Sequence, residues 1–259
     1  MLILIAESKT MSPCDGTVTM HDYSCHRPPL ESGADRVMDL LRNMDAAKLA
    51  ELTRLSTPMV RRLQEMAYDF PFKGAGGMAI ESYTGVVFKA LDYHSLDCEA
   101  KVRACSRVAI VSSLYGWLRP DDIVKAYRLD FNMKVAPDGL ALASYWRADV
   151  TRMLLDAVEN RGETDVLNLL PSDAARCIEW GRIRRKARVW KAEFKEIISG
   201  GGMRTPDAGW LKRLRGSLLR QILEDDIVSA EAMFDMEGNG FVGAGGDAES
   251  GTILFHAAR

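Results

Sequence analysis

An apolar run passes directly into a polar turn at Val108-Ala109-Ile110-Val111-Ser112-Ser113-Leu114-Tyr115-Gly116. A short run of β-branched and apolar residues that ends in a turn is typical of a buried strand. Gly116 permits unusual backbone geometry at that turn or a close approach of a ligand. We therefore predict a buried strand over Val108–Val111 that presents Ser113 and Tyr115 at its carboxyl end.

The same pattern recurs three times along the chain. Leu2–Ile5, Ala79–Tyr83 and Val166–Leu169 are predicted to be strands, and each leads into a polar turn. In mainly parallel sheets, ligands bind at the carboxyl ends of the strands, near helix N-termini. If the four strands share one sheet, we expect their turns to meet at one site. Besides the turn at Ser112–Gly116, these turns are Glu7-Ser8-Lys9-Thr10, Tyr83-Thr84-Gly85 and Pro171-Ser172-Asp173.

Helical patterns alternate with these strands. Ala46–Met66 is predicted to form a helix, a tight hairpin and a second helix, because Ser56-Thr57-Pro58 combines a break with helix-start residues. Other helices are predicted at Asp35–Leu41, after the strand Ala79–Tyr83 through Leu91, from Arg119-Pro120-Asp121-Asp122 onward, at Tyr145–Val158, after Asp173 and at Leu211–Leu223. Phe241–Gly243 and Thr252–Phe255 are predicted closing strands, and the glycine-rich patches Gly74–Gly77, Gly200–Gly202 and Gly243–Gly246 are predicted loops.

The fold class that follows is mixed α/β. A chain of 259 residues that is 47% hydrophobic can bury one large core. We expect residues 1–259 to form a single compact domain with a central sheet of mostly buried strands and a helix-hairpin-helix-like element.

Charge is nearly balanced over the whole chain, at 34 basic against 36 acidic residues, but it is unevenly distributed. From Arg176 to Arg220 there are 13 Lys and Arg against 4 Asp and Glu, a local charge of +9. From Glu224 to Arg259 the local charge is −7. A basic stretch can bind phosphates, although an ordinary solvated helix face has the same composition.

The sequence predicts a soluble cytoplasmic protein. The apolar start Met1–Ile5 is too short for a signal peptide, and no apolar run is long enough to span a bilayer. The five cysteines include no CxxC pair and show no zinc-site spacing with the four histidines, so we expect free thiols, no metal and no cofactor. No nucleophile elbow, P-loop or HExxH motif is present, and nothing pairs the acid–base candidates Glu7, Asp122 and Asp173.

Two groups of residues are candidates for binding phosphate. Lys9 and Thr10 follow the first strand, and Arg119 supplies a forked donor that matches phosphate at the start of a predicted helix. The second group is the basic helix with Lys212, Arg213, Arg215 and Arg220, which suits a polyanionic backbone. The ordinary alternatives are surface lysines and arginines, and core packing for Tyr115 and Trp117.

These strings together resemble the YaaA family of bacterial peroxide-stress proteins over nearly the whole chain. The most specific part is Ser113-Leu114-Tyr115-Gly116, Leu118-Arg119-Pro120, Asp122 and Tyr127-Arg128-Leu129. The other matches are Met1–Ile5 with Ser8-Lys9-Thr10, Tyr83-Thr84-Gly85, Tyr145-Trp146, Asn168-Leu169, Ser172, and Arg215-Gly216 with Arg220. The resemblance adds Asp122, Tyr127, Arg128, Asn168 and Ser172 to the candidate ligand-binding residues.

The resemblance implies a DNA-binding protein that limits oxidative damage linked to free iron, with a helix-hairpin-helix-like element and a basic cleft. The chain departs from the family pattern at Thr84-Gly85-Val86, at the expected lysine after Ser172, and in a hairpin without glycines. These departures leave two main hypotheses open. The partner is duplex DNA, or the chain is an enzyme acting on a nucleobase or nucleotide with a phosphate-binding pocket at the strand ends. A third hypothesis, a non-catalytic protein that binds metal or protein partners, is the weakest because no metal-ligand cluster is visible.

Overall fold

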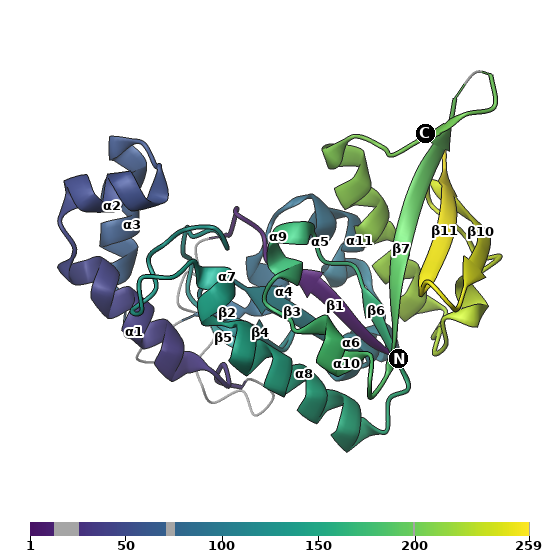
Figure 1. Cartoon of the computed structure of the whole chain (residues 1–259), viewed down its shortest axis with the longest axis horizontal. Coiled ribbons are helices and arrows are strands. Elements are labelled where there is room, and N and C mark those ends of the chain that lie inside the picture. Colours follow the sequence, from purple (N-terminus) through teal and green to yellow (C-terminus); the bar gives the residue numbers. More distant parts are fainter. Residues whose placement is uncertain (13–25, 71–75, 199, 259) are drawn as a thin grey trace.

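A computed structural model describes residues 1–12, 26–70, 76–198 and 200–258 and shows a mixed α/β fold built on one large sheet (Figure 1). In these residues the sheet has nine strands, in the order β4-β3-β1-β6-β7-β11-β10-β9, with β8 paired to β7. The strands are β1 Leu2–Ala6, β3 Val108–Ser112, β4 Gly116–Leu118, β6 Asp165–Asn168, β7 Arg188–Ile197, β8 Met203–Arg204, β9 Glu237–Gly238, β10 Phe241–Asp247 and β11 Thr252–Ala257; β2 Gly77–Met78 and β5 Ile123–Val124 pair separately.

The middle of the sheet is parallel. β1 pairs in parallel with both β3 and β6, β6 pairs in parallel with β7, and β7 with β11. Leu2–Ile5 is buried throughout, as expected for a central strand of a sheet that is covered on both faces. This confirms the predicted strands over Leu2–Ile5, Val108–Val111 and Val166–Leu169, and their carboxyl ends lie at one edge.

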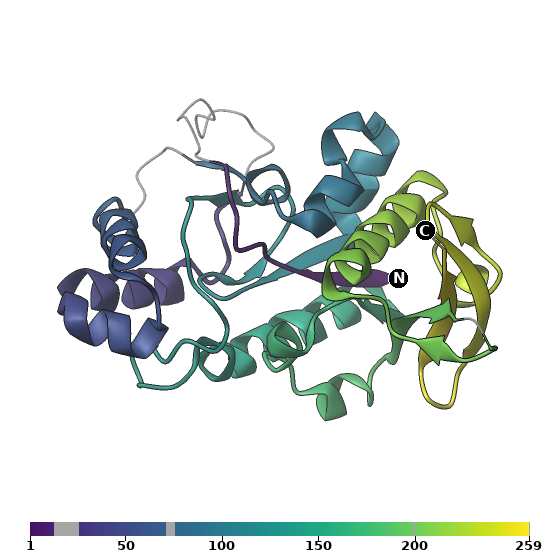
Figure 2. The same cartoon turned by 90° about the horizontal axis from the view of Figure 1, so that it is seen from above.

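Helices cover both faces of the sheet. In Figure 2, the α5–α6 segment lies on one side of β1 and α8 lies on the other. Buried side chains from both ends of the sequence belong to one continuous core. The helices are α1 Glu31–Asn43, α2 Ala46–Thr53, α3 Thr57–Tyr68, α4 Ala79–Ser82, α5 Val86–Leu91, α6 Cys98–Arg107, α7 Leu142–Tyr145, α8 Arg147–Arg161, α9 Ser172–Ala175, α10 Trp180–Ile183 and α11 Ala208–Glu224, with 3-10 turns η1 Tyr93–Ser95 and η2 Glu231–Met233.

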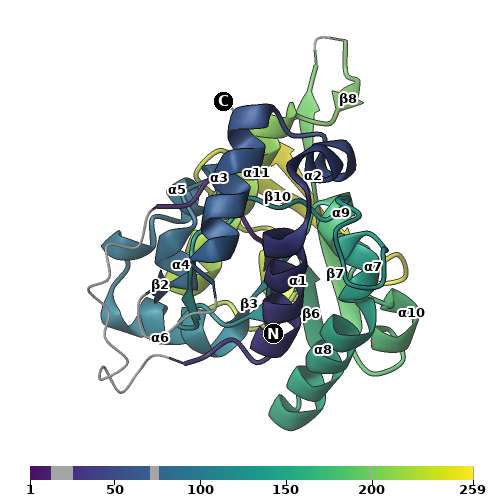
Figure 3. The same cartoon turned by 90° about the vertical axis from the view of Figure 1, so that its left-hand side faces the viewer.

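The predicted helix, hairpin and helix over Ala46–Met66 is present as α2 and α3. Asp45 caps α2 by accepting bonds from the amides of Ala47 and Lys48, and Arg54 turns the chain with a φ of 57°. Ser56 precedes the first turn of α3, which contains Pro58. Figures 1 and 3 show α1, α2 and α3 grouped at the end of the molecule opposite β10 and β11. The α2–α3 hairpin therefore lies at one end of the molecule, with Leu49, Val60 and Leu63 buried in the common core and its charged face exposed.

Two predictions fail for one linked reason. Ala79–Tyr83 is not a strand but begins with the short helix α4, and no helix starts at Arg119–Asp122. The amides of Ala79 and Ile80, at the start of α4, donate to the carbonyls of Asp122 and Pro120 at 2.8 and 3.1 Å. The Asp122 carboxylate accepts from the Arg119 amide at 2.7 Å, which closes a tight turn before β5. The loop thus satisfies the donors of α4 in place of forming a helix itself.

The predicted loop at Gly243–Gly246 is also wrong, because these residues lie inside β10. A Cβ atom at Gly243 would lie 2.6 Å from the Phe234 carbonyl oxygen, and one at Gly246 would lie 2.1 Å from the Phe234 ring. The glycines therefore allow the segment around Phe234 to pass close over a strand. Gly200–Gly202 does connect β7 to β8, as predicted. Of the predicted loop Gly74–Gly77, the first two residues lie outside the described residues, and Gly77 begins β2.

The ten-residue strand β7 was not predicted. Its residues alternate between exposed or partly exposed and buried positions, with Trp190, Ala192 and Phe194 pointing into the core. The remaining predicted helices and the two closing strands are present with shifted ends. Within the described ranges, no helix combines the length and the apolar composition that crossing a membrane requires.

Candidate functional site at the carboxyl ends of the strands

Glu7 is the first residue after β1, and its carboxylate connects the ends of two neighbouring strands. Its Oε2 atom accepts a hydrogen bond from the Ser113 amide, just after β3, at 2.8 Å. The same oxygen accepts a short hydrogen bond from the hydroxyl of Tyr127. Because β1 and β3 are adjacent and parallel, their carboxyl ends bring these groups together. Glu7 is therefore fixed at the edge where parallel sheets bind ligands.

A chain of buried hydroxyl groups lies behind Glu7. The Tyr127 hydroxyl lies 2.7 Å from the Tyr83 hydroxyl and 2.7 Å from Ser112 Oγ. Ser112 Oγ also accepts from the Tyr115 amide at 3.0 Å. Since Tyr127 donates its single proton to Glu7, the hydroxyls of Tyr83 and Ser112 act as donors to Tyr127. The network is thus oriented toward Glu7.

Burial sets the protonation behaviour of this network. Desolvation raises the pKa of Glu7 from its ordinary 4.5 to about 7, although the hydrogen bonds from Ser113 and Tyr127 oppose this change. Burial, together with the nearby charge of Glu7, raises the pKa values of Tyr83 and Tyr127 well above 10. The tyrosines therefore stay protonated, whereas Glu7 can gain or lose a proton near neutral pH.

Glu7 lines a cavity of about 380 Å³, which we call the strand-end pocket. Its walls come from the turn after β1, the start of α5, the loop before α9 and the first half of α11. A Cβ atom at Gly85 would lie 2.2 Å from Ser8 Oγ, so glycine allows the start of α5 to pack on this turn. The lining residues are Ile5–Thr10, Gly85–Phe88, Asp130, Phe131, Leu169, Pro171, Asp173, Lys212 and Arg215.

Arg215 reaches the strand-end pocket from α11 and is partly buried. Burial lowers its pKa, and the charge of Asp173 acts in the opposite direction. Its guanidinium makes no hydrogen bond or ion pair with any residue that the structure describes. Beside it, a Cβ atom at Gly216 would lie 2.3 Å from the Val87 carbonyl oxygen. Glycine at this position therefore lets α11 approach α5 and form the pocket wall.

A second cavity, of about 620 Å³, lies on the other side of Lys9 and Thr10, and we call it the basic pocket. Helix α3 forms one wall, and the segment after β5 forms another. Four basic side chains line it against a single carboxylate, that of Asp69. The lining residues are Lys9–Met11, Met59, Arg62, Met66, Asp69 and Lys125–Arg128.

Lys9 and Thr10 separate the two pockets and belong to both. Lys9 forms an ion pair with Asp130, and Arg128 donates to the Lys9 carbonyl oxygen. The Thr10 carbonyl oxygen accepts from the Thr84 amide at 2.9 Å, which brings the predicted turn Tyr83-Thr84-Gly85 to the same edge. The four predicted turns lie at one edge of the sheet, although the turn at Tyr83 follows a helix and the turn at Ser112–Gly116 contacts Glu7 without lining either pocket.

The segment Ser113–Asp122 contributes no lining residue to either pocket. Ser113 is fully buried with its Oγ unpaired among the described residues, and Trp146 Nε1 donates to its carbonyl oxygen at 2.8 Å. Gly116 has a φ of 69°, and a Cβ there would lie 2.7 Å from the Trp146 ring. The Tyr115 hydroxyl accepts from the Lys125 amide at 3.0 Å. These residues support the turn behind the site.

Arg119 and Asp122 lie in the loop that packs on α4. The Arg119 guanidinium is 3.6 Å from Asp121 and borders a separate shallow cavity with Cys105. Burial raises the pKa of Asp122 to about 7, against the opposing hydrogen bond from the Arg119 amide. Neither residue lines the strand-end pocket or the basic pocket. Of the carboxylates proposed for acid–base work, only Glu7 and Asp173 share a pocket.

Asn168 and Ser172 flank the strand-end pocket but are not among its lining residues. Asn168 Oδ1 accepts from the Leu170 amide at 3.0 Å, which shapes the turn after β6. Ser172 is exposed at the start of α9. On α11, Lys212 is exposed at the pocket, whereas Arg213 lies over the Trp210 ring at 5.5 Å.

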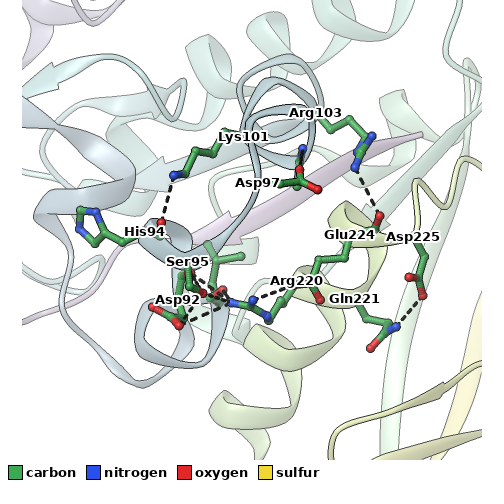
Figure 4. Close-up of polar contacts among 12 residues, drawn as sticks. Asp92, His94, Ser95, Asp97, Lys101, Arg103, Arg220, Gln221, Glu224 and Asp225 are labelled. Carbon is green, nitrogen blue, oxygen red and sulfur yellow. Dashed lines mark hydrogen bonds and ion pairs between the residues drawn. The ribbon is translucent and has the colours of Figure 1, made fainter.

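Arg220 connects two helices (Figure 4). Its Nη1 atom donates to the Leu91 carbonyl oxygen at 3.0 Å and to Ser95 Oγ at 2.8 Å. It also forms ion pairs with Asp92 at 3.7 Å and with Glu224 at 2.6 Å. Arg220 thus holds α11 against the end of α5.

Four charged side chains that line the pockets were not predicted from the sequence: Arg62, Asp69, Lys125 and Asp130. For Arg62, the sequence did contain a signal, the adjacent basic pair Arg61-Arg62, which lies on an exposed helix face. In the described ranges, no group of three or more His, Cys, Asp or Glu side chains lies close enough to hold a metal ion. Cys98, Cys105 and Cys177 are free thiols, and Cys14 and Cys25 lie outside the described residues.

Comparison with known proteins gives consistent matches along the chain. Residues 1–244 match the family model described as peroxide stress protein YaaA. A UPF0246 protein of Laribacter hongkongensis is 31% identical over 235 residues, covering 88% of each chain. UPF0246 proteins of Alteromonas mediterranea and Caulobacter vibrioides are 25% and 28% identical over 93% of this chain, and cover 92% and 93% of their own lengths.

Proposed function

Because the chain belongs to the peroxide stress protein YaaA family, we propose that it acts in the peroxide stress response by binding duplex DNA across the α2–α3 hairpin and the adjoining basic pocket. The observation that carries this proposal is the group of exposed cations on the hairpin. Arg54, Arg61 and Arg62 are exposed, and none of them forms an ion pair with a described residue. Unpaired cations on an outward-facing element are suited to a phosphate backbone.

The basic pocket extends this surface inward. Lys125 donates to the Asp69 carbonyl oxygen at 2.7 Å, and Arg128 donates to the Lys9 carbonyl oxygen. The neutral carbonyl partner orients Arg128 without cancelling its charge. The cations therefore continue from Arg61 and Arg62 on α3 into the basic pocket, which Arg128 lines. Such a path supports the contact of one DNA backbone with several side chains.

A rival basic surface lies at Arg182–Arg188, near the opposite edge of the sheet. Its charge is partly neutralised, because Lys186 pairs with Glu159 at 3.0 Å and Arg188 pairs with Asp165 at 2.8 Å. The hairpin arginines have no such partners among the described residues. We therefore place the DNA contact on the hairpin.

Fluorescence anisotropy with a labelled DNA duplex tests the proposal. The binding constant falls as salt concentration rises, and each lost phosphate contact reduces the magnitude of the slope of log K against log salt concentration by about 0.9. Arg61→Gln with Arg62→Gln should reduce this magnitude by about 2 and weaken binding at low salt. The control is Arg147→Gln with Arg152→Gln on α8, which removes the same net charge elsewhere. Equal slopes for the hairpin variant and the wild type would refute the proposed contact.

A further inference from the structure

We propose that the strand-end pocket is a separate binding site for a nucleoside monophosphate, with the phosphate on Arg215 and Lys212 and the nucleobase against the Glu7 carboxyl group. The site goes beyond the proposed DNA contact because it would be occupied in the absence of DNA. Its volume of about 380 Å³ is in the usual range for small-molecule sites. Among its lining residues, Arg215 and Lys212 suit an anion, and Glu7 with two phenylalanines suits a polar ring.

Arg215 is the first candidate to bind the anion. A partly buried guanidinium without an ion-pair partner is costly, because desolvation is not offset by a counter-charge. Lys212 precedes it by three residues on α11, so the two side chains share a helix face and both line the pocket. A phosphate monoester supplies the missing negative charge and can accept two parallel hydrogen bonds from an arginine.

The other cation at the pocket is already neutralised. Lys9 pairs with Asp130, so its charge is committed to a carboxylate within the protein. Asp173 lies close enough to affect the pKa of Arg215 but is not within ion-pair distance. The anion is therefore expected at Arg215 and Lys212 and not at Lys9.

Glu7 is the lining residue suited to contact a nucleobase. Its Oε2 atom is fixed by Ser113 and Tyr127, and the carboxyl group faces the pocket from the end of β1. A carboxyl group that is protonated can donate to a ring carbonyl or nitrogen, and an ionised one accepts from a ring N–H. The apolar walls include Phe88 and Phe131, whose side chains suit a flat ring.

Isothermal titration calorimetry with GMP is the direct test. Wild-type protein should bind GMP more tightly than about 1 mM, and more tightly than guanosine, ribose 5-phosphate or inorganic phosphate. Arg215→Gln should weaken GMP binding about tenfold or more, because a charge-assisted contact is lost. Arg213→Gln is the matched control, since Arg213 lies on the same helix over Trp210 and does not line the pocket.

Further variants keep the test decisive. If Arg215→Gln fails to fold, Lys212→Gln on the exposed side of the pocket should still weaken GMP binding. Glu7→Gln should reduce the preference for GMP over ribose 5-phosphate. The proposal is overturned if the wild type does not bind GMP, or if the Arg213 and Arg215 variants bind it equally. Ribose 5-phosphate binding as tightly as GMP overturns the nucleobase contact.

The test is independent of the DNA proposal. Arg61→Gln with Arg62→Gln changes α3 but no residue of the strand-end pocket, so it should leave GMP binding unchanged. A protein that binds GMP but not DNA would refute the proposed function and support this site. A protein that binds DNA but not GMP would do the reverse.

Discussion

Replacing Glu7 by glutamine should change how stability depends on pH. Burial raises the Glu7 pKa to about 7 in the folded protein, against its ordinary value of 4.5. Below pH 4.5 the group is protonated in both states. Between pH 4.5 and 7 the unfolded chain releases the proton while the folded protein retains it, so the free energy of unfolding falls as pH rises. The difference between the two pKa values corresponds to at most about 3 kcal/mol.

Glutamine keeps the size and polarity of the side chain but does not titrate in this range. The variant should therefore become more stable relative to the wild type by up to about 3 kcal/mol as pH rises from below 4.5 to above 7. Urea denaturation of both proteins at several pH values measures this difference. Asp122 has a similarly raised pKa, but its contribution is present in both proteins and cancels.

Glu65→Gln on the exposed side of α3 is the control for the loss of one negative charge. A stability difference between Glu7→Gln and wild type that stays constant from about pH 4 to about pH 8 would refute the reasoning, because the burial of Glu7 would then have no effect on its proton affinity.

Three further predictions concern the packing that forms the site. Gly216→Ala should destabilise the protein by about 1–3 kcal/mol in urea denaturation, because the added methyl group meets a backbone carbonyl of α5. Gly181→Ala, in the short helix α10 with no atom within 4 Å of the added Cβ, should be neutral or stabilising by up to about 1 kcal/mol, and equal effects of the two changes would contradict the close-packing argument. Arg220→Ala should cost about 2 kcal/mol and raise amide hydrogen exchange in α5, whereas an unchanged exchange rate would show that Arg220 does not hold the two helices together. Gly116→Ala should destabilise by more than about 1 kcal/mol through its positive φ and the Trp146 contact, and an unchanged urea midpoint would rule out this strain.

The parallel centre of the sheet was predictable because its strands are short, apolar runs that end in polar turns. The same reasoning failed at Ala79–Tyr83, where a run of four or five residues fits a strand and one helical turn equally well. It failed at Arg119–Asp122 because proline and aspartate are also turn residues. There the carbonyl groups of Pro120 and Asp122 accept hydrogen bonds from the first amides of α4. Local sequence does not encode this contact between distant segments.

The site was predictable as a meeting of turns but not as a set of partners. That Lys9 and Thr10 lie at the strand ends follows from local sequence. That Arg215 lines the same pocket as Glu7 depends on how closely α11 approaches α5, which Gly216 permits. Strand β7 was missed because its many basic residues made the segment resemble a solvated helix face. The sequence does contain a strand signal there, which is the alternation of the apolar residues Trp190, Ala192 and Phe194 with charged residues.

Hydrogen–deuterium exchange of the full chain, with and without a saturating DNA duplex, tests the proposed DNA contact most directly. We predict that DNA slows exchange in peptides covering Ala46–Tyr68 and the segment Lys125–Arg128, because the backbone would then lie across α3 and the basic pocket. Protection confined to Arg182–Arg188, or no protection in a complex shown to be formed, would contradict the account.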